Sequence, residues 1–86
     1  MPLANIPDGW TQKDNALVRT HKFPSFVDAM AFAMKLAFHA EREDHHPDLH
    51  ISYRTVTIEW TTHDQGGVTE KDVAGATFTN TLLLVT

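Results

Sequence analysis

A long run of helix-forming residues between two prolines constrains this chain more than any other feature. Residues 27–42 contain neither glycine nor proline, and Pro24 and Pro47 flank them. Ser25 stands at the N-cap position, with an acid three residues later as an approximate capping box. Because proline lacks an amide donor and restricts the residue before it, Pro47 should stop the helix and His46 should mark its exit. The sequence predicts one long helix here.

Polar side chains occupy only a narrow stripe of this helix. They are Asp28, Lys35, His39 and Arg42. Apolar groups therefore cover most of the circumference, which is more than one face of a sheet can bury. Because large exposed apolar patches are uncommon on soluble monomers, we expect a partner chain and an oligomer.

Alternating residues on both sides of the helix predict strands. Residues 16–23 form one strand, closed by a proline. After the helix, apolar side chains fall on odd positions at Ile51 and Tyr53, then on even positions from Val56 onward. A change of phase in a period-two pattern requires a turn or bulge near Arg54-Thr55, and a hairpin is the simplest account.

A second capping box opens a second helix. Thr69 and Asp72 form the box, and the helix should run through Phe78. The last eight residues have as much strand as helix character, so propensity leaves them open. The order is one or two strands, a helix, two strands and a helix. It predicts an α+β two-layer sandwich, an antiparallel sheet with helices on one face and with open edges that offer a second route to assembly.

Composition narrows the class of protein. With 86 residues and 42% hydrophobic content, the chain can build one small core, so we predict a single domain over residues 1–86. Eleven acids against seven Lys and Arg give a net charge of −4, the wrong sign for a nucleic-acid binder. Without cysteine, stability must come from packing or assembly. The start of the chain lacks a targeting pattern and residues 27–40 are too short and polar to span a bilayer, which favours a cytoplasmic protein.

Six histidines are a high count for this length, and His45, His46 and His50 lie within six positions. Glu41 precedes His45 by four residues, so on a helix its carboxylate would lie on the same face and orient or charge the imidazole. The helix C-terminus and Asp44 also favour imidazolium, so His45 could exchange protons near neutral pH. The alternative is that these histidines are ordinary surface residues at a helix exit.

Other candidate residues have competing interpretations. His63 precedes a Gly-Gly loop and could project into a cleft or be an ordinary loop residue. A metal site could draw on His39, His45, His46, Glu41 and Asp44, but their spacing matches no zinc motif, and we predict no metal. Trp10 is either a core aromatic or the wall of a pocket for a flat heterocycle. We assign no function to His21 or His50.

The segment Glu41-Arg42-Glu43-Asp44-His45-His46-Pro47, followed by Tyr53, His63 and Asp72, resembles the pterin-4a-carbinolamine dehydratases. That family has an acid, three residues, His-His-Pro or His-Asn-Pro, five residues, an aromatic, nine residues, usually His, and a later Asp. Flanking residues also fit, and the resemblance covers about residues 7–76. Residues 77–86 depart from it, because they do not resemble the family's charged amphipathic helix end.

The resemblance implies a dehydratase that converts 4a-hydroxytetrahydropterin, such as 4a-hydroxytetrahydrobiopterin, to quinonoid dihydropterin and water in tetrahydropterin recycling. It implies His45, His46 and His63 as catalytic histidines. The substrate-binding candidates are Glu41, Asp44, Thr61, Thr62, Asp64 and Trp10. It further implies a strand-strand-helix-strand-strand-helix fold, no cofactor beyond the pterin substrate, and a homodimer or homotetramer.

The proposed reaction needs both an acid and a base. Hydroxide leaves poorly unless it is protonated, and the ring must then lose a proton. We expect His45 and His63 to form the acid–base pair and His46 to orient the substrate. The main alternative is a non-enzymatic dimeric interaction module of the same fold, because some family members are dimerisation cofactors for transcription factors. A metal-binding module is a more distant alternative.

Overall fold

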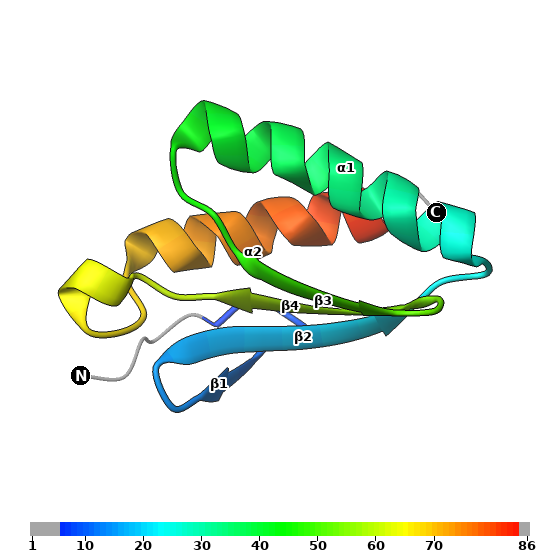
Figure 1. The fold of residues 1–86 in the computed structure, drawn as a ribbon. Helices are drawn as coiled ribbons and strands as arrows, with labels where there is room; N and C mark the ends of the chain where they lie inside the picture. Colours follow the sequence, from blue (N-terminus) through cyan, green and yellow to red (C-terminus); the bar gives the residue numbers. More distant parts are fainter. Residues whose placement is uncertain (1–5, 85–86) are drawn as a thin grey trace.

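A four-stranded antiparallel sheet carries both helices of the chain on one face (Figure 1). This computed structural model describes residues 6–84. The elements in chain order are β1 (Thr11–Lys13), β2 (Ala16–Lys22), α1 (Phe26–Glu43), β3 (Asp48–Ser52), β4 (Thr55–Trp60), the 3-10 helix η1 (His63–Gln65) and α2 (Glu70–Leu83). The sheet order is β1-β2-β4-β3. The predicted α+β class is confirmed.

The ends of α1 have different causes. At its start, the Ser25 hydroxyl accepts a hydrogen bond from the backbone N–H of Asp28 at 3.1 Å and donates to the Asp28 carboxylate at 2.8 Å, so the predicted cap is confirmed. At its end, Asp44 adopts the left-handed conformation with φ of 52°. Asp tolerates this conformation, which closes a helix through backbone bonds to the last turn. The predicted exit at His46 is therefore two residues late, since Asp44 ends the helix before Pro47 can.

Only one side of α1 packs against the sheet. Its buried residues are Ala29, Phe32, Leu36 and Ala40. A second apolar row stays in solvent and consists of Val27, Met30, Met34 and Phe38, which are 74%, 46%, 58% and 68% exposed. We call this row the α1 stripe. The excess of apolar surface that the sequence predicted is thus present on the single chain.

Two tight hairpins set the register of the sheet. Ser52 pairs with Thr55 across the β3–β4 turn, where Tyr53 has a positive φ of 54°. The predicted turn is confirmed one residue early, and it explains why the apolar pattern changes phase. Strand β1 pairs antiparallel with β2. Its three residues are all exposed, so they show no alternation of apolar and polar side chains. Only the family resemblance indicated a strand before β2.

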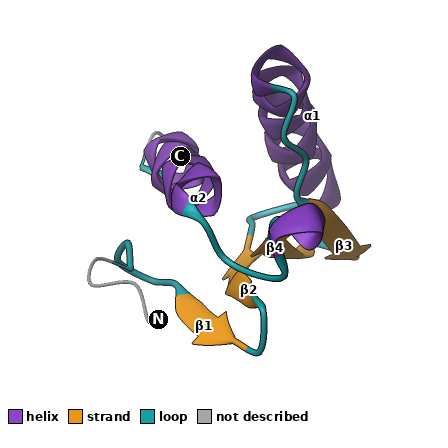
Figure 2. Cartoon of the chain, turned by 90° about the vertical axis from the view of Figure 1, so that its left-hand side faces the viewer, coloured by secondary structure: helices purple, strands orange, loops and turns teal. Residues whose placement is uncertain are grey.

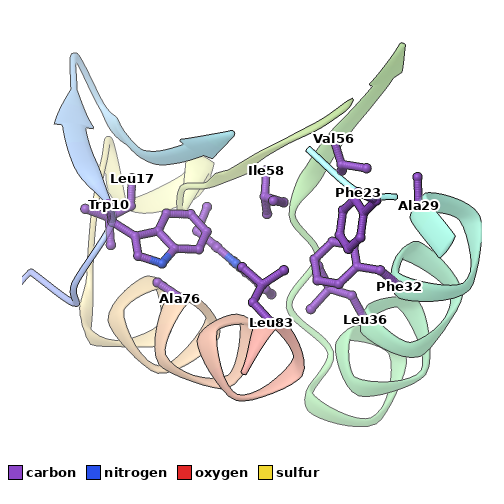
Figure 3. Close-up of a cluster of buried hydrophobic side chains, with 11 residues drawn as sticks. Trp10, Leu17, Phe23, Ala29, Phe32, Leu36, Val56, Ile58, Ala76 and Leu83 are labelled. Atoms are coloured by element: carbon purple, nitrogen blue, oxygen red, sulfur yellow. The ribbon is translucent and has the colours of Figure 1, made fainter. Parts of the chain in front are cut away.

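The core lies between the sheet and the two helices (Figure 3). Leu17, Val56, Ile58 and Trp60 project from the strands and are essentially inaccessible to solvent. Trp10 is buried in the same cluster, and its indole N–H donates to the Asn80 side chain at 2.7 Å. It is therefore a core aromatic, as the first of its two interpretations expected.

Helix α2 extends to Leu83, beyond the predicted Phe78. The ambiguous residues are helical because a tertiary contact outweighs propensity: the buried Thr79 hydroxyl accepts from the Trp60 indole at 3.2 Å. The same hydroxyl donates within its own helix to the Gly75 carbonyl at 2.7 Å. Residues 85–86 lie outside the described residues. Across residues 6–84, neither helix is both long and apolar enough to traverse a bilayer.

Candidate active site

The candidate residues gather at one end of the molecule, which Figure 2 views directly. Here α1 ends, β4 leads into η1, and α2 begins (Figure 1). His45 and His46 lie on the loop after α1, His63 begins η1, and Asp72 lies in the first turn of α2. Segments that are distant in sequence thus meet at this end.

His45 is held by a carboxylate from the opposite helix. Its Nε2 lies 2.6 Å from Oδ1 of Asp72, which is fully buried, while the His45 side chain is 16% exposed. The Asp72 carboxylate also accepts the backbone N–H of Thr69 at 2.9 Å, and this bond closes the predicted capping box. Asp72 therefore caps the start of α2 and also holds His45.

Glu41 contacts His46 instead of His45, which corrects the pairing expected from helical spacing. Glu41 Oε2 lies 2.6 Å from Nε2 of His46. The expected i, i+4 geometry fails because the chain turns left-handed at Asp44, so His45 is no longer on the helix. The side chains of His46 and Glu41 are 53% and 78% exposed, so this pair orients the imidazole but adds little stability.

The His45 ring also lies against an aromatic support. It stacks on Trp60 with ring centroids 5.4 Å apart and an angle of 24° between planes. The indole can reach this position because Gly75 of α2 has no side chain: a Cβ there would lie 2.6 Å from the Trp60 ring. Trp60 and Asp72 together determine where His45 lies.

A cleft of about 230 Å³ opens beside His45, between the two helices. It is lined by His39, Glu43, His45, Trp60, Lys71, Ala74 and Gly75. The His39 ring stacks on Phe78 at 3.7 Å with nearly parallel planes. Burial lowers the pKa of His39, an effect that Glu43 opposes and Arg42 reinforces. The cleft therefore contains a second imidazole, in which the neutral form is favoured.

His63 lies on a different surface, at the end of an open groove of about 600 Å³. The groove runs along the sheet face that carries no helix, and its lining includes Asp48, Glu59, Thr61 and His63. The Thr61 hydroxyl donates to the carbonyl of Asn15. A third hollow is lined by Thr62, Asp64, Gln65, Thr69, Glu70 and Lys71. Five of the predicted site residues therefore line three separate hollows at this end of the molecule: His45 lines the first, Thr61 and His63 the second, and Thr62 and Asp64 the third. Glu41, Asp44 and His46 line none of these three.

Three other candidates from the sequence, Asp44, Thr62 and Trp10, lie in different surroundings. Asp44 is the exposed left-handed cap of α1, immediately before His45. The Thr62 side chain points inward and bonds to Asp72 at 2.7 Å. Trp10 lines none of the three hollows. Among residues 6–84, no three His, Asp or Glu side chains are arranged to hold a metal ion.

Sequence reasoning missed the partner of His45. The sequence marks Asp72 only as a helix cap and as the last position of the family pattern. It gives no reason to select Thr69 or Gly75 as site residues. The required Asp at the end of that pattern was the available signal, since a buried acid at a helix start needs a partner nearby.

Comparison of the chain with known proteins shows which family it belongs to. The family model described as Pterin 4 alpha carbinolamine dehydratase matches residues 2–82. The chain belongs to the pterin-4a-carbinolamine dehydratase family. A Mycobacterium avium relative is 52% identical over 66 residues, covering 77% of this chain and 70% of that protein. A Picosynechococcus relative is 49% identical over 70 residues, covering 81% and 75%. Both are named "Putative pterin-4-alpha-carbinolamine dehydratase".

Two solved structures have the same fold. A transcriptional coactivator/pterin dehydratase from Brucella melitensis superposes with a TM-score of 0.83 at 38% identity, covering 87% of this chain and 82% of that one. A pterin dehydratase-like RuBisCO assembly factor of the alpha-carboxysome gives a TM-score of 0.68 at 24% identity, covering 85% and 84%. The latter comparison shows the fold alone.

Proposed function

We propose that this member of the family dehydrates a 4a-hydroxytetrahydropterin to quinonoid dihydropterin and water. The observation that carries the proposal is the 2.6 Å contact between His45 and the fully buried Asp72. A carboxylate that orients an imidazole leaves the other ring nitrogen available for proton transfer. The family membership supplies the substrate class.

The reaction removes a hydroxyl from ring carbon 4a and a proton from the adjacent ring nitrogen. The carbon–oxygen bond breaks as an imidazolium gives its proton to the departing oxygen, which leaves as water. The proton on the ring nitrogen passes to a neutral imidazole. The electron pair of the broken N–H bond then forms the new carbon–nitrogen double bond. Only protons are exchanged, so two histidines suffice. We assign them to His45 and His63, with His46 orienting the substrate. Because the two histidines line separate hollows, the pterin would have to lie across the end of the molecule between them.

The remaining substrate contacts are proposals of the same kind. Glu41 and Asp44 precede His45 and His46, and Thr61 and Asp64 lie on either side of His63 in the sequence. We assign these four residues to the pterin site at this end of the molecule. The test is the disappearance of 4a-hydroxytetrahydropterin with and without the protein, together with His45→Ala and His63→Ala. No acceleration by folded wild type would overturn the proposal.

The α1 stripe supports a homo-oligomer. Its four large side chains are 46–74% exposed and lie on the side of α1 that faces away from the core. A second copy presents the same stripe, so two or four chains can cover one another by symmetry. We expect a homodimer or homotetramer whose mass in solution falls towards one chain in Met34→Glu. Lys35→Glu, on the neighbouring polar stripe, is the matched control.

The same exposed stripe favours the second candidate, a non-enzymatic interaction module. A module of this kind needs the stripe but not the histidines, so its partner binding would survive His45→Ala and fail in Met34→Glu. For a dehydratase, the rate of the chemical step would instead fall in His45→Ala and survive in Met34→Glu. The cytoplasmic location and the single domain over residues 1–86 stay predictions.

A further inference from the structure

Thr62 has a nearly inaccessible side chain, although it lines one of the hollows at this end of the molecule. It follows β4 and is only 5% exposed. Its backbone is fixed on both sides, since its N–H donates to the Gly67 carbonyl at 3.0 Å and its carbonyl accepts from the Gly67 N–H at 3.2 Å. The side chain therefore faces the protein interior, where it meets the first turn of α2.

The hydroxyls around Asp72 form a chain with one direction. The Thr62 hydroxyl donates to Asp72 Oδ2 at 2.7 Å. Since that uses its single hydrogen, the 2.9 Å contact between the Thr62 and Thr69 hydroxyls must be donated by Thr69. The Thr69 hydroxyl in turn accepts the backbone N–H of Lys71 at 3.2 Å. The Thr69 hydroxyl also lies 3.5 Å from Oδ2, a longer contact than its 2.9 Å contact with Thr62, so both hydroxyls donate towards the carboxylate.

This chain leaves only one role for each oxygen of Asp72. Oδ2 accepts from Thr62 and from the Thr69 backbone, so Oδ1 is the atom that faces His45. An ionised carboxylate only accepts hydrogen bonds, so with Asp72 in that form the Nε2 of His45 carries the hydrogen of their shared bond. Nδ1 is then the His45 nitrogen that can exchange a proton with a ligand.

We propose that Thr62 is a positioning residue, which acts through Asp72 to hold His45 in the Nε2–H tautomer and leave Nδ1 for proton transfer. The inference rests on the proposed dehydratase function. Asp72 is completely buried and Thr62 is 5% exposed, so the loss of a hydrogen-bond donor to this carboxylate is costly. Without the Thr62 hydroxyl, the carboxylate loses its shortest Oδ2 bond and becomes free to turn away from His45.

The test compares Thr62→Val, which keeps the shape without the hydroxyl, with Thr62→Ser, which keeps the hydroxyl. Loss of a group that orients a metal-bound histidine costs about 10- to 100-fold, and by analogy we expect kcat to fall by that factor in Thr62→Val with little change in KM. Thr62→Ser should recover most of it. Thr77→Val is the control, because the Thr77 hydroxyl bonds only its own helix at the Val73 carbonyl.

Nitrogen-15 spectra of the His45 ring provide a readout that does not depend on activity. Wild type and Thr62→Ser should show one tautomer with hydrogen on Nε2, and Thr62→Val should show a mixture. Thr62→Ala is the reserve variant if Thr62→Val does not fold, and it should show the same mixture of tautomers and the same fall in kcat. A folded Thr62→Val with wild-type kcat and one tautomer would overturn the inference.

These readouts separate the inference from the proposed function. If wild type shows no dehydration but the tautomer changes in Thr62→Val, the function is wrong while the positioning contact stands. If wild type is active and neither kcat nor the tautomer responds to Thr62→Val, the function stands and the positioning role of Thr62 is wrong.

Discussion

His45 Nε2 and Asp72 Oδ1 lie 2.6 Å apart, although the two residues belong to different segments of the chain. Asp72 is also the residue that completes the N-terminal capping box of α2. Helix formation and placement of the imidazole therefore depend on the same carboxylate. This arrangement explains why an acid that looks like an ordinary helix cap in the sequence belongs to the site.

We predict that Asp72→Asn impairs both activity and stability. The amide has one acceptor atom where the carboxylate accepts bonds at both oxygens, so a buried donor loses its partner at a cost of about 1–3 kcal/mol. Dehydratase kcat should fall about 10²-fold or more because the tautomer of His45 is no longer held. Urea unfolding and steady-state kinetics measure the two effects. Glu70→Gln, an exposed acid in the same helical turn, should show neither large effect.

Gly75→Ala should displace Trp60 and, through it, His45. The added Cβ would lie 2.6 Å from the indole ring, so either the indole or α2 must move. Overpacking of this kind costs about 1–3 kcal/mol. Thermal unfolding and tryptophan fluorescence should both report the change. Thr81→Ala, at an exposed position of the same helix, should leave the fluorescence unchanged, and the same result for Gly75→Ala would contradict the packing described above.

Asn80 should matter for stability but not for substrate affinity. Its side-chain oxygen accepts from the Trp10 indole and from Arg19, both at 2.7 Å, and its amide donates to the Asp8 carbonyl at 3.0 Å. Asn80→Ala removes these bonds, and we expect a loss of about 1–3 kcal/mol in the free energy of unfolding. KM should stay at its wild-type value. An unchanged unfolding midpoint in urea would show that the N-terminal segment is held by other contacts.

His39 should make the fold less stable in acid. Burial lowers its pKa from the usual 6.5, so below pH 6.5 the unfolded chain binds a proton that the folded chain resists. Stability from this residue is therefore complete above pH 6.5 and is lost as the pH falls towards the folded pKa. His39→Gln should show a weaker decline of melting temperature over that interval. Parallel curves for the two proteins would contradict this prediction.

The sequence predicted the features that depend on local chemistry. The Ser25 cap, the Thr69–Asp72 capping box and the hairpin turn all follow from residue types at short spacing, and the structure contains each of them. The excess apolar surface of α1 also followed from helical periodicity alone. These features need no knowledge of how the elements pack.

The features that the sequence did not predict depend on tertiary contacts. Helical spacing assigned Glu41 to His45, and a single left-handed residue at Asp44 redirected it to His46. The link between His45 and Asp72 joins residues 27 positions apart, and no periodic pattern reports such a contact. The end of α2 depends on a hydrogen bond between Thr79 and Trp60, which helix propensity does not include.

The central claim is that this chain dehydrates a 4a-hydroxytetrahydropterin with His45 and His63. The most direct measurement is the rate at which enzymatically generated 4a-hydroxytetrahydropterin disappears, followed by ultraviolet absorbance with wild type, His45→Ala and His63→Ala. We predict a clear acceleration by wild type and a loss of about 10²- to 10⁴-fold in each variant, the usual contribution of a general acid or base. A folded wild type that leaves the spontaneous rate unchanged would contradict the account.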